Sequence, residues 1–230
     1  MQFPLTKVNE FIKSTGDEEG ITSLWGDFGV GKTTLSLQTA NLHALNNKKV
    51  LYLYTKPNFP FNKIRTVFEN NLKEVLENVS FIYTPIFDDI FNFMFNLEFS
   101  VLSDLKTKNG TFNLIIIDSM TYLYRLELNR EKKDKNFILN YRLNQLLANL
   151  VNLTQKYKIS TLIVNEISRR TQGGEIHEME SGGNIMQYWV TDSIKIERTD
   201  VANNRRLILS RGNDNISLTL DSMLTECGFE

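Results

Sequence analysis

Cysteine and histidine are scarce in this chain of 230 residues. Cys227 is the single cysteine, and His43 and His177 are the two histidines. One cysteine excludes an internal disulfide, and so few thiols and imidazoles leave no zinc site of the ordinary ligand spacing. We therefore expect a protein of a reducing, intracellular compartment.

Net charge and long apolar runs are also missing. The 26 lysines and arginines nearly cancel the 27 aspartates and glutamates, so any contact with DNA must come from a local patch. No run of about 18 apolar residues is present, and the first residues, "MQFPLTKVNEFIK", lack the apolar core of a signal peptide. We expect a cytoplasmic protein with no membrane partner.

Linker-like, repetitive and low-complexity tracts are absent too, and 41% of the residues are hydrophobic. These features predict a single domain over residues 1–230. Short apolar runs alternate with longer segments whose apolar residues lie three and four positions apart: "ITSLW", "KVLYLY", "VSFIY", "NLIIID" and "ISTLIV". This pattern predicts an α/β fold with a mostly parallel, twisted sheet flanked by helices. After residue 190, apolar and polar residues alternate, which indicates an antiparallel C-terminal extension.

The stretch "GDFGVGKT" follows the first apolar run and precedes a helical pattern. It matches the phosphate-loop pattern G-x-x-x-x-G-K-[ST], in which glycines let backbone N–H groups and a helix N-terminus surround nucleotide phosphates. Lys32 would bridge the outer phosphates, and we expect its side chain to face solvent without nucleotide. The Thr33 hydroxyl would ligate Mg²⁺. The alternative is a chance glycine turn. The candidate nucleotide-binding residues here are Gly26, Asp27, Phe28, Gly29, Val30, Gly31, Lys32, Thr33 and Thr34.

A second candidate metal ligand is Asp118, at the end of the run "NLIIID". Ligands of open α/β sheets bind at the carboxyl ends of the strands, where this aspartate is expected to lie. Together with Thr33 it would hold Mg²⁺. The alternative is an aspartate that caps a turn after a core strand.

Longer segments carry a resemblance to a known family. "GDFGVGKTTLSLQTA" resembles the phosphate loop of RecA/RadA recombinases, and "NLIIIDSMTYLYRLEL" resembles the corresponding strand and exit of the archaeal RadB proteins. "LLANLVNLTQKYKISTLIVNEI" and "GGNIMQYWVTDSIKIER" are similar to later segments of the family. The resemblance runs from Thr6 to the C-terminus, although residues 84–110 match only in length and helical character.

This resemblance implies a RecA-like P-loop NTPase core that binds ATP and Mg²⁺. The function it implies is that of an accessory protein of DNA repair and homologous recombination, which binds single-stranded or branched DNA and hydrolyses ATP weakly. A recombinase or repair nuclease would be its protein partner, and the oligomeric state stays open. The first alternative is a DNA-dependent strand-exchange ATPase of the RecA/RadA type. A small-molecule kinase is the other alternative, although the sequence lacks an evident arginine-rich lid.

Three positions depart from the family pattern. Lys56, in "YTKPNF", takes the place of the glutamate that orients the attacking water, and an ammonium group cannot act as that base. It would pair with the γ-phosphate or point to solvent. Glu166 takes the place of the glutamine that senses the γ-phosphate. A carboxylate there is repelled by the triphosphate unless Lys56 or Mg²⁺ compensates its charge, or unless Glu166 has become the base. Lys63 takes the place of an arginine that stacks on adenine, and lysine stacks less well.

DNA contacts would come from two loops at the family positions. The first, residues 124–142, carries a net charge of plus three, and its candidate contacts are Arg130, Lys132 and Lys133. The alternative interpretation is that these charges belong to the solvent-exposed start of a helix. The second loop, "ISRRTQGGEIHEMESGG", offers Arg169 and Arg170 but is slightly acidic as a whole. Its paired glycines indicate mobility that a partner would order.

Overall fold

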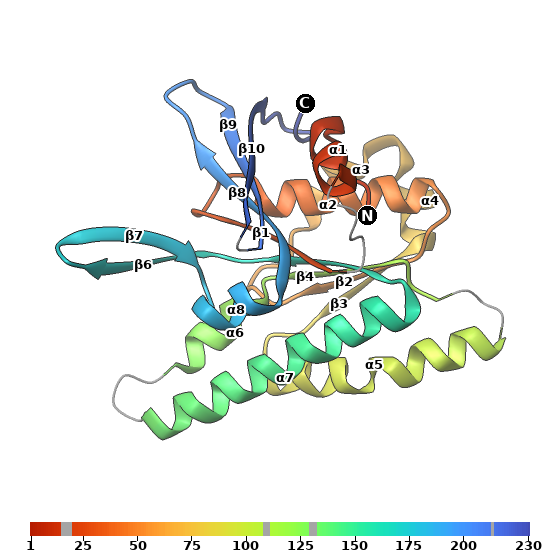
Figure 1. Ribbon diagram of the computed structural model, residues 1–230. Coiled ribbons are helices and arrows are strands. Elements are labelled where there is room, and N and C mark those ends of the chain that lie inside the picture. The colour runs from red at the N-terminus through yellow and green to blue at the C-terminus, as the bar shows by residue number, and fades with distance from the viewer. Residues whose placement is uncertain (15–19, 108–110, 129–132, 213) are drawn as a thin grey trace.

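A computed structural model describes residues 1–14, 20–107, 111–128, 133–212 and 214–230. Helices cover both faces of a central sheet, and a separate two-stranded ribbon projects from one side (Figure 1). The predicted fold class, an α/β fold with a mostly parallel sheet and an antiparallel C-terminal extension, is confirmed.

Among the described residues the central sheet has eight strands in the order β10-β9-β8-β1-β5-β4-β2-β3. Neighbouring strands from β8 to β3 run parallel, and β9 and β10 add antiparallel pairs at one edge. The strands are β1 (Ile21–Gly26), β2 (Val50–Tyr54), β3 (Val79–Tyr83), β4 (Leu114–Asp118), β5 (Ser160–Val164), β8 (Val190–Arg198), β9 (Asn204–Arg211) and β10 (Asp214–Met223). The parallel order brings the carboxyl ends of β1, β4, β5 and β2 to one edge of the sheet, where ligands of α/β folds bind.

The helices form two layers. The described helical segments are α1 (Thr6–Ser14), α2 (Lys32–Leu45), α3 (Phe61–Phe68), the 3₁₀ turn η1 (Glu69–Asn71), α4 (Leu72–Asn78), α5 (Phe87–Thr107), α6 (Met120–Glu127), α7 (Lys133–Tyr157) and α8 (Gly183–Trp189). Helices α1 to α4 share one buried cluster with one face of the sheet, and α5 to α8 share a second cluster with the other face.

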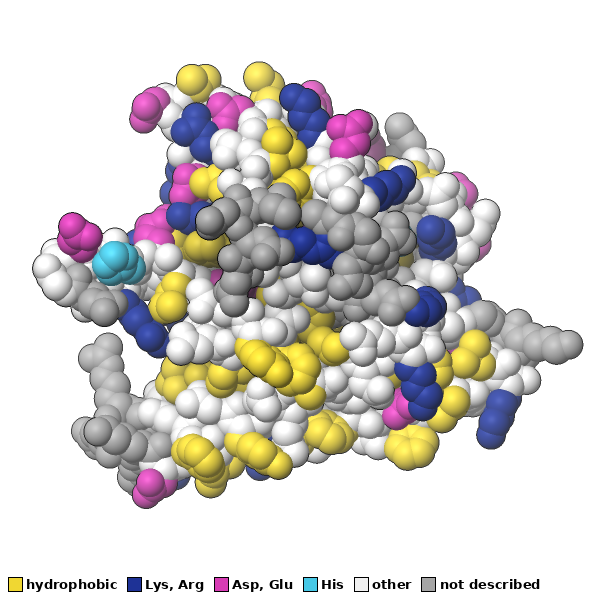
Figure 2. All heavy atoms as spheres, viewed as in Figure 1, with side chains coloured by type: hydrophobic (Ala, Val, Ile, Leu, Met, Phe, Trp, Pro, Cys, Tyr) yellow, Lys and Arg dark blue, Asp and Glu magenta, His cyan; other side chains and the backbone are white. Residues whose placement is uncertain are grey.

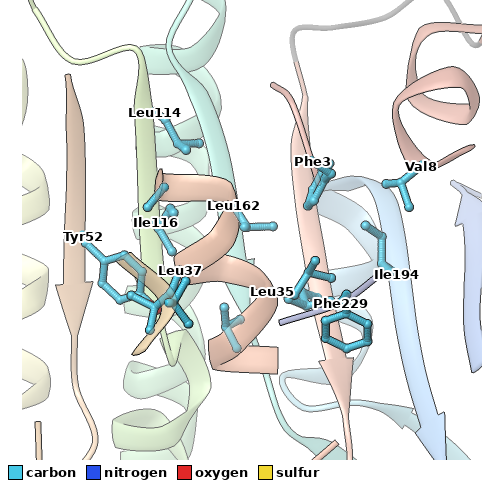
Figure 3. Close-up of a cluster of buried hydrophobic side chains, with 14 of the residues drawn as sticks. Phe3, Val8, Leu35, Leu37, Tyr52, Leu114, Ile116, Leu162, Ile194 and Phe229 are labelled. Carbon is cyan, nitrogen blue, oxygen red and sulfur yellow. The ribbon is translucent and has the colours of Figure 1, made fainter. Parts of the chain in front are cut away.

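Strand β4 shows why its sequence reads as an unbroken apolar run. Leu114 and Ile116 belong to the cluster under α2, whereas Ile115 and Ile117 belong to the cluster over α5 and α7. Figure 3 shows Leu114 and Ile116 facing the helix that carries Leu37. Burying each such side chain stabilises the fold by about 1.5–3 kcal/mol, so this strand is a firm support for the Asp118 that ends it.

The segment predicted as the second DNA loop contains a regular hairpin. Strands β6 (Ile167–Gln172) and β7 (Glu175–Glu180) pair antiparallel, and Gly173 and Gly174 form the turn with φ values of 62° and 86°. Two consecutive glycines with positive φ are typical of a two-residue hairpin turn, so the sequence held a signal for this ribbon. Within the described residues, no helix combines the length and the hydropathy that a membrane crossing requires.

Candidate nucleotide site

The phosphate loop joins β1 to α2. Gly26 and Gly31 adopt φ values of 147° and 105°, in the region that favours glycine. A Cβ at Gly26 would lie 2.2 Å from the carbonyl oxygen of Ile196, and one at Gly31 would lie 2.9 Å from the ring of Phe229. Glycine is therefore required at both positions, and the loop delivers the chain directly into the N-terminus of α2 at Lys32.

Lys32 lies folded over the loop. Its Nζ donates hydrogen bonds to the carbonyl oxygens of Gly26 at 2.9 Å and Asp27 at 2.6 Å. The residue is 6% exposed, so the expectation that it faces solvent is wrong. Burial, together with the nearby charge of Lys56, lowers the pKa of Lys32 from 10.5 to about 8. Loop carbonyls thus hold the ammonium at the mouth of the site.

Asp118 is fully buried at the end of β4. Its Oδ2 accepts hydrogen bonds from the Thr33 hydroxyl at 2.6 Å and from the Tyr52 hydroxyl at 3.2 Å. Burial raises the pKa of Tyr52 well above 10, so this hydroxyl stays protonated and remains a donor. Tyr52 is in turn hydrogen-bonded to Ser36 of α2 at 2.7 Å. The two residues expected to hold Mg²⁺, Thr33 and Asp118, are therefore side by side.

The other oxygen of Asp118 fits a cation. No described group donates a hydrogen bond to the buried Oδ1 atom, although Lys56 Nζ lies 3.3 Å away. A buried carboxylate oxygen without a hydrogen bond is costly unless a cation compensates it. With the Thr33 hydroxyl in contact with the same carboxylate, the donor set is one of hard oxygens, which Mg²⁺ prefers.

Lys56 is placed beside Asp118 by the residue before it. The backbone N–H of Thr55 donates to the carbonyl oxygen of Asp118 at 2.9 Å, and the Thr55 hydroxyl donates to that of Ser119 at 2.8 Å. These bonds join the ends of β2 and β4. Lys56 therefore enters the site with its side chain only 19% exposed, rather than pointing to solvent.

Glu166, which follows β5, is held between two cations. Its Oε2 lies 3.1 Å from Arg125 Nη1 on α6, and its Oε1 lies 3.8 Å from Lys56 Nζ. An ion-paired network thus runs from Asp118 through Lys56 and Glu166 to Arg125. The sequence prediction gave Lys56 or Mg²⁺ as the compensating cation for Glu166, and it assigned no role here to Arg125.

A cavity of about 290 Å³ opens at the phosphate loop. Lys63 of α3 lines it, as do Lys32 and Lys56. The other lining residues are Phe28, Gly29, Gly31, Thr33, Thr34 and Leu224. Three lysines expected to contact nucleotide therefore surround one cavity, and such a concentration of positive charge suits a polyphosphate.

The ribbon contacts the phosphate loop through Arg169. Its Nη2 donates to both carboxylate oxygens of Asp27, at 2.9 and 2.7 Å, and its Nε donates to Glu178 at 3.1 Å. Arg170 is opposite His177 in the ribbon and is exposed. Of the first loop, Arg130 and Lys132 lie outside the described residues, and Lys133 begins α7 but its side chain is not described.

Comparison with known proteins gives the family. The family model of Rad51 matches residues 6–209. The chain belongs to the Rad51 family. This agrees with the arrangement above, in which a phosphate loop, a buried aspartate after a neighbouring strand and a ribbon at the same edge come together on a mostly parallel sheet.

Among members of the Rad51 family, archaeal RadB proteins are similar over most of this chain. A protein named "DNA repair and recombination protein RadB" from Methanocaldococcus jannaschii is 29% identical over 191 residues, which are 83% of this chain and 84% of that protein. The protein of the same name from Methanococcus maripaludis is 28% identical over 204 residues, which are 89% of this chain and 87% of that protein. Another protein of this name, from Methanosphaera stadtmanae, is 26% identical over 197 residues, which are 85% of this chain and 81% of that protein. The resemblance to RadB-like members of the RecA/RadA family is confirmed.

Proposed function

We propose that this protein is an ATP-binding accessory protein of DNA repair and homologous recombination, which binds DNA and hydrolyses ATP slowly. The observation that carries the proposal is the contact between Thr33 and Asp118 beside the phosphate loop, with Lys56 at the place of the catalytic glutamate. The names of the RadB relatives supply the biological process.

In this proposal the loop from Gly26 to Thr34 binds the phosphates of ATP, and Lys32 moves from the loop carbonyls to the outer phosphates. Thr33 and Asp118 would hold Mg²⁺. When bound, this ion neutralises charge on the phosphates. Lys63 of α3, which lines the same cavity, contacts the nucleotide.

Slow hydrolysis follows from the charges around Glu166. Lys56 takes the place of the usual glutamate, and Glu166, the other candidate base, lies between Lys56 and Arg125. Each oxygen of Glu166 faces one of these two cations, so neither is free to orient an attacking water, and Glu166 is poorly placed to activate it. ATP then acts mainly by favouring one arrangement of the site and the ribbon over another.

DNA binding is proposed for the basic residues of the two segments at the family's DNA-loop positions: Arg130, Lys132 and Lys133 in the first, and Arg169 and Arg170 in the second. On the face that Figure 2 shows, the Lys and Arg side chains of the described residues are scattered among acidic and hydrophobic ones rather than merged into one patch. Binding through a few local contacts, with modest affinity, suits this distribution. A recombinase or repair nuclease would be the protein partner, acting in the cytoplasm.

The runner-up is a strand-exchange ATPase stimulated by DNA. Its active site would need a base for the attacking water, and Glu166 is the candidate that the geometry leaves. The pairing of Glu166 with Arg125 at 3.1 Å favours the accessory function instead.

Lys32→Ala tests the nucleotide site. We expect the variant to lose ATP binding, because the ammonium that contacts the outer phosphates is gone. Isothermal titration calorimetry with ATP measures the effect. Because Lys32 is buried, the unfolding free energy must be measured alongside it. A folded variant that binds ATP as tightly as wild type would refute the site.

A further inference from the structure

The two oxygens of Asp118 have different surroundings. Oδ2 accepts hydrogen bonds from Thr33 and Tyr52. Oδ1 is buried without a hydrogen bond from any described group, and the nearest cation of the chain is Lys56 Nζ at 3.3 Å. One oxygen is therefore left for a cation, and an ammonium group already lies beside it.

The position of that ammonium is fixed from several sides. The bonds of Thr55 to Asp118 and Ser119 hold the backbone just before Lys56. Glu166 lies on the other side of the ammonium at 3.8 Å, and Arg125 holds Glu166 in turn. Lys56 is thus placed between two carboxylates, an arrangement that also suits a divalent metal ion.

A metal ion and an ammonium group at one carboxylate oxygen repel each other strongly in a buried site. Lys56 also lines the cavity at the phosphate loop, within reach of the same space as Lys32 and Lys63. The chain therefore supplies from its own side chains much of the positive charge that a phosphate-loop site otherwise takes from Mg²⁺.

Building on the proposed nucleotide site, we propose that Lys56 is a tethered cation at Asp118 that supplies positive charge whether or not Thr33 and Asp118 hold Mg²⁺, so that the site binds ATP with little dependence on the metal. Glu166 and Arg125 are positioning residues for it. ATP occupancy then follows the nucleotide concentration and responds little to free Mg²⁺.

The test compares the dissociation constant of ATP in Mg²⁺ and in EDTA, measured by calorimetry on the full chain. For wild type we expect the constant to rise by less than about threefold when the metal is removed, whereas in Lys56→Met it rises by at least about tenfold. Lys56→Arg retains the positive charge, so the ratio of its dissociation constants in EDTA and in Mg²⁺ should be as small as that of wild type. The same ratio for the wild-type protein can be measured without any substitution, so it tests the proposal even where Lys56→Met is unstable.

Lys63→Met is the matched control, because it removes a lysine from the same cavity but leaves the pair of Lys56 with Asp118 in place. It should weaken ATP binding by the same factor in Mg²⁺ and in EDTA. A wild-type ratio of a hundredfold, or an unchanged ratio in folded Lys56→Met, would overturn the tethered-cation role while leaving the nucleotide site intact. Wild-type protein that binds ATP in neither condition would refute the nucleotide site itself.

Discussion

Glu180 is a buried carboxyl group at the end of β7, and it connects the ribbon to the sheet. It accepts hydrogen bonds from Ser23 of β1 at 3.0 Å and from the side chain of Asn165 at 2.6 Å. Asn165 also accepts hydrogen bonds from the backbone N–H and the hydroxyl of Thr121 on α6. Burial raises the pKa of Glu180 from 4.5 to about 7, since the two hydrogen bonds to the charged form offset the loss of water only in part.

Glu180→Gln should therefore stabilise the protein at neutral pH. Below about pH 4.5 the carboxyl group is protonated in both the folded and the unfolded chain, so its ionisation costs nothing. As the pH rises from 4.5 to 7, the unfolded chain ionises first, and the folded state is disfavoured by up to about 3 kcal/mol. Urea unfolding of both proteins across this range measures the difference. Parallel pH profiles for wild type and variant would contradict a raised pKa.

For individual residues, the sequence was enough to recognise those that belong to local motifs. It did not show which side chains surround them in the folded protein. Gly26, Lys32, Thr33 and Asp118 are recognisable because the phosphate loop and the aspartate after an apolar strand are local patterns. Nothing local shows that Tyr52, in the middle of an apolar strand, donates to Asp118, or that Lys32 is buried over its own loop. Both depend on how strands distant in sequence are ordered in the sheet.

The ribbon is the element that the sequence reading missed, and its contact with the phosphate loop gives it a role there. Arg169 holds both oxygens of Asp27, while Arg198 of β8 donates to the carbonyl oxygen of Phe28 at 2.7 Å. The ribbon and an inner strand thus fix the loop from outside. The distance between these residues in sequence explains why a pattern-based reading assigned Arg169 to DNA alone.

Arg169→Ala should weaken ATP binding by about three- to tenfold, because Asp27 is then left as an unpaired negative charge in the phosphate loop. The unfolding free energy should change little, since both side chains are about half exposed and solvent screens the pair. Titration calorimetry measures the ATP affinity, and urea unfolding measures the unfolding free energy. The double change with Asp27→Asn should restore the affinity.

Arg206→Ala is the control for this experiment. Arg206 pairs with Asp221 across β9 and β10 in a similar two-bonded contact, and its exposure matches that of Arg169. Its partner Asp221 lies on β10 rather than in the phosphate loop, so the substitution should leave ATP affinity unchanged. Equal effects of the two substitutions would show that the ribbon contact has no special part in nucleotide binding.

For the molecule as a whole, the alternation of apolar runs and helical segments was enough to predict the parallel sheet and its antiparallel extension. Each strand carries its own signal, because strands buried on both faces are apolar throughout. The charge arrangement could not be predicted in the same way. Lys56, Glu166 and Arg125 come from three segments, and only the strand order brings them into one network next to Asp118.

The central claim is that this site binds ATP but turns it over slowly. A positioned general base contributes about a hundred- to ten-thousand-fold to rate, and we propose that Lys56 stands in its place. The direct measurement is steady-state ATP hydrolysis with Mg²⁺, with and without single-stranded DNA, at ATP concentrations shown by calorimetry to saturate the protein. We predict turnover near background in both conditions, and an increase in Lys56→Glu combined with Glu166→Gln. Brisk hydrolysis by the wild-type protein when single-stranded DNA is added would contradict the claim and would identify Glu166 as the base.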